Sequence, residues 1–190
     1  MVDTSQAYDN VIGTCQDIFA KKMRDYGTAW RVLRPTSITD QIYIKANRVR
    51  HIEQKGVARV DEGVIPELIG IANYAIMGLI QLEKGEGERV PAEEIVDLYR
   101  AGFQKAKQLM LDKNHDYDEA WRKMRLSSYT DLILMKISRV KQIEDHAGVT
   151  LVSEGIDANY LDIINYAVFG LIRLLVEGEA SKSPDHACRS

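Results

Sequence analysis

The 190-residue sequence contains one segment twice, and this duplication limits the possible folds more than any other feature. The segment Asp25–Arg31 recurs as Asp116–Arg122, 91 residues further along the chain. The correspondence holds at that spacing as far as Glu53, and then at a spacing of 92 from Gly56 to Ile80. Self-similarity of this kind means that one structural unit is built twice.

Each repeat predicts three helices. Long stretches rich in Ile, Leu, Met and Ala alternate with short polar segments, the whole chain has four prolines, and no Asn-Gly or Asp-Gly pair separates alternating strands. The expected helices are Ser5–Arg24, Ser37–Lys55 and Val64–Lys84, followed by Pro91–Lys113, Ser128–His146 and Ile156–Val176. We therefore predict an all-α, MazG-like helical bundle of two tandem three-helix repeats, related by a pseudo-two-fold axis and sharing one core.

Small and polar residues mark the expected helix ends. Ser37 and Ser128 are typical N-terminal caps, and Pro91 suits a first helical position. Gly56 and Gly148 are expected to end the second helix of each repeat. This assigns residues 1–85 to the first repeat, 86–176 to the second and 177–190 to a flexible tail.

Composition excludes several classes of protein. The chain has 25 Lys and Arg against 28 Asp and Glu, a net charge of −3, which argues against a nucleic-acid binder. No apolar run reaches the roughly 18–20 residues of a membrane span, and the N-terminus lacks a signal-peptide pattern. Cys15 and Cys188 make no disulfide framework. We expect a soluble, cytoplasmic protein with no membrane or nucleic-acid partner.

Paired cations interrupt the apolar pattern of the second helix in each repeat. Lys136 and Arg139 are three residues apart, hence neighbours on one helical face, and Lys45 and Arg48 repeat the arrangement. Such side chains either extend to solvent or meet an anion. The two interpretations are partly exposed helix charges, or a site for phosphate or carboxylate.

Carboxylates interrupt the third helices. Asp162 lies among aliphatic residues, so it needs a cation, which can be Lys136, Arg139 or a metal. The purely structural alternative is a buried ion pair joining two helices. The first repeat has Gly70 opposite Asp162, but it has Glu67 where the second repeat has Asn159. The two carboxylates either complement each other in one composite site or are remnants.

Other polar and aromatic residues remain candidates. Glu154 and Asp157 form an acidic pair before and within the last helix, where the helix dipole alone also favours them. Trp121 and Tyr117, like Trp30 and Tyr26, either stack on a base or belong to the core between repeats. The third helices also carry the equivalent amides Asn73 and Asn165, which we group with Trp121 and Tyr117 as candidate nucleotide-binding residues.

At these residues the chain resembles a known family. The pattern Lys-x-x-Asp-Tyr-x-x-Ala-Trp-Arg begins at Lys22 and again at Lys113, and each copy is followed by Lys-x-x-Arg, Glu-Gly and Asn-Tyr-Ala. This layout resembles a bacterial family of unknown function called nucleotide-modification-associated domain type 1, over nearly the whole chain. More remotely it is similar to the all-α nucleoside triphosphate pyrophosphohydrolases of the MazG and dimeric dUTPase type.

The resemblance implies a nucleotide ligand and Mg²⁺. In the pyrophosphohydrolases a Glu-Glu-x-x-Glu helix and a later Glu-x-x-Asp helix hold Mg²⁺; Asp162 matches the last Asp and Glu67 its Glu. The first acidic motif has no match, because Lys45, Arg48, Lys136 and Arg139 stand there. Lysine and arginine bind phosphate directly, so nucleotide binding survives this departure better than metal-dependent hydrolysis.

Two hypotheses follow. In the first, the protein binds a nucleotide or nucleotide derivative and could hydrolyse its α–β phosphoanhydride, with Mg²⁺ held by Asp162, Glu154 and Asp157. Lys136 and Arg139 then neutralise phosphate charge. In the second, the chain is a non-catalytic helical binding or assembly module with structural ion pairs. A homodimer is compatible with either.

Overall fold

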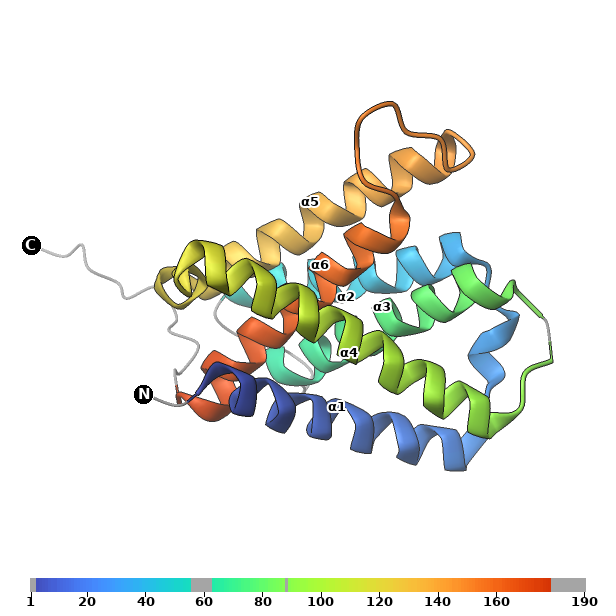
Figure 1. Ribbon diagram of the computed structural model, residues 1–190, viewed down its shortest axis with the longest axis horizontal. Coiled ribbons are helices and arrows are strands. Elements are labelled where there is room, and N and C mark those ends of the chain that lie inside the picture. Colours follow the sequence, from blue (N-terminus) through green and yellow to red (C-terminus); the bar gives the residue numbers. More distant parts are fainter. Residues whose placement is uncertain (1–2, 56–62, 88, 179–190) are drawn as a thin grey trace, which may run out of the picture.

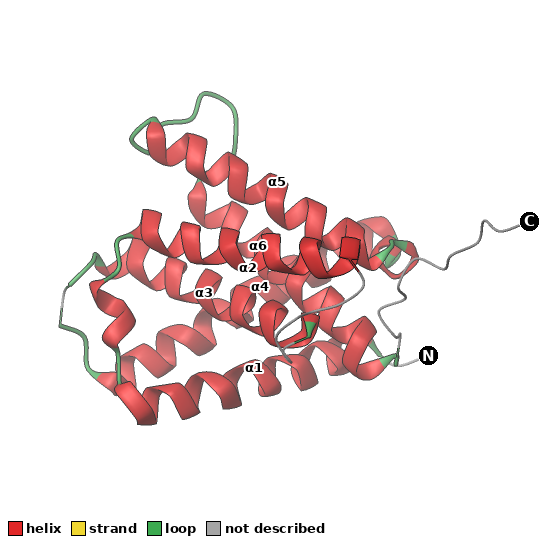
Figure 2. Cartoon of the chain, turned by 180° about the vertical axis from the view of Figure 1, so that it is seen from behind, coloured by secondary structure: helices red, strands yellow, loops and turns green. Residues whose placement is uncertain are grey.

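The computed structural model describes residues 3–55, 63–87 and 89–178, and these form helices joined by short loops (Figure 1). None of the described residues lies in a β-strand, which confirms the predicted all-α class (Figure 2). The helices of the first repeat are α1 (Thr4–Tyr26), α2 (Pro35–Lys55) and α3 (Val64–Lys84), and those of the second are α4 (Ala92–Tyr117), α5 (Leu126–Asp145) and α6 (Ile156–Leu171).

Three short helical segments complete the fold. Two 3₁₀ turns, η1 (Ala29–Val32) and η2 (Ala120–Lys123), occupy equivalent positions in the two repeats, and a π-helical turn, η3 (Ile172–Val176), extends α6. The sequence pattern does not predict the two 3₁₀ turns, because a single four-residue turn has too few residues for a hydrophobic period.

The predicted helix starts differ from the observed ones in α2 and α5. Both helices begin two residues early, so Ser37 and Ser128 lie inside the first turn and are not caps. In α2 the first residue is Pro35, whose fixed φ suits the start of a helix and whose missing N–H needs no partner there. Pro91 lies just outside α4, at the N-cap position, one residue before its expected place.

The C-terminus of α5 lies three residues before the expected glycine. After Asp145, Ala147 and Gly148 adopt left-handed φ angles of 55° and 81°, and the Gly148 N–H donates to the Ile143 carbonyl over 2.8 Å. Glycine adopts that backbone conformation freely, so Gly148 still marks the stop. The equivalent Gly56 lies outside the described residues.

The two repeats share one core. Helices α3 and α6 pack against each other at its centre, and both contact α1 and α4 (Figure 1). Helix α2 packs on α3, α5 packs on α6, and α2 also contacts α5. The close approach of α3 and α6 needs glycine, since a Cβ on Gly78 would lie 2.8 Å from the Tyr160 ring and one on Gly170 would lie 3.1 Å from Leu68.

Hydrogen bonds between the repeats come in reciprocal pairs. The Tyr8 hydroxyl donates to Asn165 Oδ1 over 2.7 Å, and the equivalent Tyr99 donates to Asn73 Oδ1 over the same distance. Other contacts also occur twice with the roles of the repeats exchanged: Thr39 with Glu144 and Thr130 with Glu53, and Lys141 with Asp40 and Arg50 with Asp131. Each repeat therefore supplies hydrogen-bond partners for polar side chains of the other.

Two helical segments are apolar enough, by length and composition, to cross a membrane, although polar residues interrupt the apolar run in both. These are residues Val64–Lys84 and Ile156–Val176, whose most apolar windows have mean hydropathies of 1.4 and 1.3. Both are mostly buried in the bundle, with 67% and 78% of those windows inside it. Central helices of a soluble protein have the same character, because they are covered on all sides.

Candidate functional site

A pocket of about 310 Å³ lies in the first repeat, between α1, η1, α2 and α3. Among the described residues, its lining combines aromatic, aliphatic and cationic side chains with one amide and contains no carboxylate. The lining residues are Ile18, Phe19, Lys22, Met23, Tyr26, Gly27, Trp30, Lys45, Pro66, Ile69, Gly70, Asn73, Tyr74 and Met77.

Two lysines give the pocket its charge. Lys22 comes from the exposed face of α1, and no carboxylate of the described residues forms an ion pair with it. Lys45 comes from α2, and its Nζ lies 6.0 Å from the centre of the Tyr74 ring. The Lys45 chain lies against Gly70, where a Cβ would come within 2.7 Å of Lys45 Cε. The missing side chain at Gly70 is therefore what lets Lys45 cross α3 at this point.

Three aromatic rings with polar groups also line the pocket. Tyr26 is 55% exposed, whereas Trp30 is buried and its Nε1–H has no hydrogen-bond partner among the described residues. Burial, together with the neighbouring Tyr26, raises the pKa of Tyr74. Tyr74 consequently stays a neutral hydrogen-bond donor at neutral pH.

Glu67 lies beside the pocket and holds two of the predicted site residues. Its carboxylate is buried and accepts from Arg48 Nη1 over 2.8 Å and from Lys45 Nζ over 3.3 Å. The structure thus brings Lys45, Arg48 and Glu67 together as an ion-pair cluster within the first repeat. Both carboxylate oxygens of Glu67 face cations.

Asp162 forms the corresponding cluster of the second repeat. Its Oδ1 lies 2.5 Å from Lys113 Nζ and its Oδ2 lies 2.6 Å from Lys136 Nζ. Burial by itself raises the pKa of Asp162, but the hydrogen bonds and charges of the two lysines outweigh it and lower the pKa below its usual value. Asp162 is therefore ionised at neutral pH, and both its oxygens are engaged.

The other predicted residues near Asp162 form no ion pair with it among the described residues. Arg139 is exposed, and among the described residues no carboxylate forms an ion pair with it. Asn159, which stands where the first repeat has Glu67, donates from Nδ2 to the Gly155 carbonyl over 2.8 Å. Glu67 and Asp162 thus each pair inside their own repeat and not with the same cations.

The predicted nucleotide-binding aromatic residues of the second repeat differ in solvent exposure. Trp121 is buried and stacks on Phe169, with ring centres 4.3 Å apart and an interplanar angle of 6°. Arg122 lies 4.5 Å from the same indole ring. Tyr117, the last residue of α4, is 70% exposed.

The predicted amides Asn73 and Asn165 are buried and bonded on both sides. Besides accepting from Tyr99 and Tyr8, they donate to the carbonyls of Cys15 and Ala106 over 3.2 and 3.1 Å. Asn73 nevertheless lines the pocket of the first repeat.

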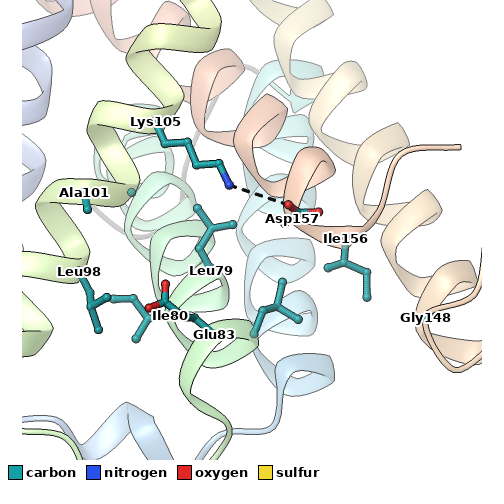
Figure 3. A pocket seen from close by; sticks show the side chains of 11 residues that line it. Leu79, Ile80, Glu83, Leu98, Ala101, Lys105, Gly148, Ile156 and Asp157 are labelled. Atoms are coloured by element: carbon teal, nitrogen blue, oxygen red, sulfur yellow. Dashed lines mark ion pairs between the residues drawn. The ribbon is translucent and has the colours of Figure 1, made fainter.

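Asp157 lines a second cavity of about 490 Å³ between α3, α4, α6 and the loop at Gly148 (Figure 3). Its Oδ2 lies 4.0 Å from Lys105 Nζ across this cavity, whose other walls include Leu79, Leu98 and Ile156. Glu154 is exposed on the loop before α6 and does not line the cavity. The cavity is mainly aliphatic, with its charges at Lys105, Asp157 and Glu83.

The predicted ligands Asp162 and Glu67 do not fit a Mg²⁺ cage in the described structure. Magnesium is held by free carboxylate oxygens and water in octahedral geometry, whereas both oxygens of Asp162 and of Glu67 face ammonium or guanidinium groups. In the described ranges 3–55, 63–87 and 89–178, no three His, Cys, Asp or Glu side chains are grouped so that they could hold a metal ion. Magnesium binding stays a prediction.

The sequence pattern does not single out Lys22, Tyr74 and Gly70 as parts of a site in the first repeat, nor Lys113 as a partner of Asp162 in the second. A signal for the lysines was present, since Lys22 and Lys113 begin the two copies of the repeated motif. No signal placed them beside Lys45 and Lys136, because α1 and α2 approach each other only in the folded bundle.

Comparison with known proteins agrees with the duplication. The family described as nucleotide modification associated domain 1 matches residues 22–82 and again residues 113–174. No curated protein and no solved structure matches the chain. The two matched stretches contain both lysine clusters, the motif tryptophans and the pocket residues from Lys22 onward, and together they cover well over half of the chain. The chain therefore belongs to the nucleotide modification associated domain 1 family and carries that domain twice.

Proposed function

We propose that the first repeat binds a nucleotide or nucleotide derivative in the pocket between Lys22, Lys45 and Trp30. The observation that carries this proposal is the composition of the lining in the described part of the chain, with two lysines, three ring systems that have polar groups, and no carboxylate. A volume of about 310 Å³ lies at the lower end of the range of about 300–1,000 Å³ typical of small-molecule sites. Such a pocket suits one base with one phosphate better than a dinucleotide.

Each part of a nucleotide has a matching group. Lys22 and Lys45 supply ammonium donors for a phosphate, since Lys22 has no ion-pair partner among the described residues and Lys45 is only loosely held by Glu67 at 3.3 Å. Trp30 and Tyr26 supply ring faces and Tyr74 a neutral hydroxyl for a base and sugar. The description of the family, which refers to nucleotide modification, supports the same ligand class.

The proposal covers binding, and Mg²⁺-dependent hydrolysis is a separate proposal with its own test. Pyrophosphate release from deoxynucleoside triphosphates, measured with and without Mg²⁺, tests it, with Asp162→Ala as the variant.

The reciprocal contacts between repeats support a pseudo-two-fold axis, which we propose together with binding.

Tryptophan fluorescence tests the binding proposal directly, because the chain has two tryptophans and only Trp30 is on the pocket lining. In the variant Trp121→Phe all tryptophan emission comes from Trp30. Titration with dAMP, dCMP, dGMP and dTMP is expected to change this emission saturably for at least one of them. In the matched variant Trp30→Phe, the emission of Trp121 is expected to change much less.

Lysine substitution provides the second arm. Lys22→Gln removes one charge-assisted contact worth about 1.5–3 kcal/mol, so the Kd measured by calorimetry should rise at least about tenfold. Lys21→Gln is the matched control, because Lys21 is adjacent on α1 but pairs with Asp17 and does not line the pocket. Absence of binding of all four nucleotides to the wild type, or equal effects of the two substitutions, contradicts the proposal.

A further inference from the structure

The second repeat has side chains where the first repeat has its pocket. By the 92-residue correspondence, Asp162 stands in place of Gly70, and Phe169 stands in place of Met77. Gly70 and Met77 both line the first-repeat pocket. The repeats also differ at other lining positions, but at these two the second repeat has a carboxylate and an aromatic ring where the first has a glycine and a methionine.

The contacts of Asp162 are those that a bound anion would make. Its two carboxylate oxygens lie 2.5 Å from Lys113 Nζ and 2.6 Å from Lys136 Nζ. These lysines are the equivalents of Lys22 and Lys45, the cations of the described pocket lining. The side chain of Asp162 is 6% exposed, so the anion position is enclosed.

The contacts of Phe169 are those that a bound base would make. Its ring is stacked on Trp121 with 4.3 Å between centres and 6° between planes. Trp121 is the equivalent of Trp30, the buried indole that lines the open pocket. Offset parallel stacking is the contact by which proteins hold bases on tryptophan.

The spacing of the two groups describes the ligand. Asp162 and Phe169 are seven residues apart on continuous α6, which places them two turns apart on one face, at about 10 Å along the axis. An anion at one end and a flat ring at the other, joined by a short linker, is the layout of a nucleoside 5′-monophosphate. A free nucleoside lacks the anion, and inorganic phosphate lacks the ring.

We infer that the second repeat is a closed copy of the nucleotide site, occupied by its own Asp162 carboxylate and Phe169 ring, and that the ligand of the open copy is a nucleoside 5′-monophosphate. This inference rests on the proposed function of the first repeat. Gly70 and Met77 leave that site open, and the chain accordingly binds one nucleotide and not two.

Exchange of the two positions between repeats tests the inference. Asp162→Gly with Phe169→Met gives the second repeat the residues of the first at these two positions, and titration calorimetry with dAMP, dCMP, dGMP and dTMP should then give two sites per chain where the wild type gives one. Phe169→Met alone keeps the carboxylate and should stay at one site. Asp162→Ala with Phe169→Met serves as the second opened variant, because alanine favours a helix more than glycine does.

The reverse exchange closes the open copy. Gly70→Asp with Met77→Phe should reduce binding to the first repeat by at least tenfold. The three atoms nearest to the new Cβ at position 70 all belong to the flexible end of Lys45, which can move to pair with the carboxylate as Lys136 does. Circular dichroism and the melting temperature identify variants that do not fold.

A further spectroscopic readout separates the two copies. In a Trp30→Phe background, only Trp121 emits, and its emission should respond to nucleotide after opening of the second repeat but not before. One site in the wild type together with one site in both folded, opened variants overturns the inference and leaves the proposed function intact. No binding to the wild type overturns the proposed function and, with it, the ligand assigned to the open copy; one site in an opened variant would then support only the closure of the second repeat by Asp162 and Phe169, and no binding to either overturns both proposals entirely.

Discussion

The Tyr8 hydroxyl donates to Asn165 Oδ1 over 2.7 Å although the two residues are 157 positions apart in the chain. Tyr8 is fully buried, and Asn165 is nearly so. The contact joins the first helix of one repeat to the third helix of the other, and Tyr99 with Asn73 forms its counterpart. Each repeat thus completes a buried hydrogen bond of the other, which ties the stability of both to one folding unit.

Removal of either hydroxyl should therefore destabilise the whole bundle. Tyr8→Phe leaves Asn165 Oδ1 without this donor in a buried place, and we expect the free energy of unfolding to fall by about 1–3 kcal/mol. Tyr99→Phe should have a similar effect, because Asn73 is equally buried. Urea denaturation followed by circular dichroism measures both, and Tyr117→Phe, at an exposed position, is the control. Loss of two-state behaviour in one variant alone would argue against a single unfolding unit.

The buried lysine of the second repeat should matter more than a surface lysine. Lys136→Met leaves the buried Asp162 carboxylate with Lys113 alone. Breaking a buried ion pair typically costs about 3–5 kcal/mol, and the remaining lysine places the expected loss near the lower end. Lys141→Met, which removes an exposed pair with Asp40, should cost less than about 1 kcal/mol. Equal losses in the two variants would contradict the assignment of Asp162 to a buried cluster.

Glu53 predicts a specific dependence of stability on pH. Burial raises its pKa, which the hydrogen bond from Thr130 partly opposes and the neighbouring Asp131 adds to. The folded state therefore binds the proton of Glu53 more tightly than the unfolded state does. As the pH rises from the unfolded pKa of Glu53 through its raised folded pKa, the free energy of unfolding of the protein consequently falls. Glu53→Gln removes the titration but keeps an acceptor for Thr130.

We expect Glu53→Gln to gain stability relative to the wild type as the pH rises from 3.5 to 7, in urea denaturation at matched ionic strength. Glu144→Gln should behave in the same way, because burial raises the pKa of Glu144, with Thr39 opposing and Asp40 adding. A difference between variant and wild type that does not change with pH would show that neither carboxyl has a raised pKa.

Ala147 is under backbone strain that glycine would relieve. Its φ is 55°, a left-handed conformation that costs a residue with a Cβ about 1–2 kcal/mol. Ala147→Gly also increases the entropy of the unfolded chain, so the net gain in stability should be about 0.5–1 kcal/mol. Gly148→Ala, at a φ of 81°, should change stability in the opposite direction. A shift of the same sign in both variants, measured by the urea midpoint at constant m-value, would contradict this.

The sequence predicted the helices because each one carries its own periodic pattern. Helix α3 has the expected bounds, Val64–Lys84. Helix α2 begins at Pro35 and not at Ser37. Proline occupies a first helical position without loss of a hydrogen bond, and this preference outweighs the tendency of Ser37 to cap the helix. Local signals of similar strength compete within one turn, so the ends of helices are less determined than their middles.

The repeat also identified the functional candidates by comparison of the chain with itself. Lys45 and Lys136 interrupt the apolar pattern at equivalent positions, and the difference between Gly70 and Asp162 is visible in the sequence alone. Whether this difference fills or opens a site depends on which helices pack beside residues 70 and 162. Lys113 reaches Asp162 from α4 and Lys136 reaches it from α5, and neither distance follows from spacing along the chain.

The sequence by itself determined that this protein is a duplicated all-α chain with cations and carboxylates set into apolar helices, because periodicity, repetition and residue type are properties of the chain. Only the tertiary structure decided that Asp162 forms ion pairs with Lys113 and Lys136 of its own repeat, whereas beside Gly70 the equivalent lysines line a pocket. The physical reason is that an ion pair or a cavity is set by the approach of helices distant in sequence, and that approach depends on packing of the whole core.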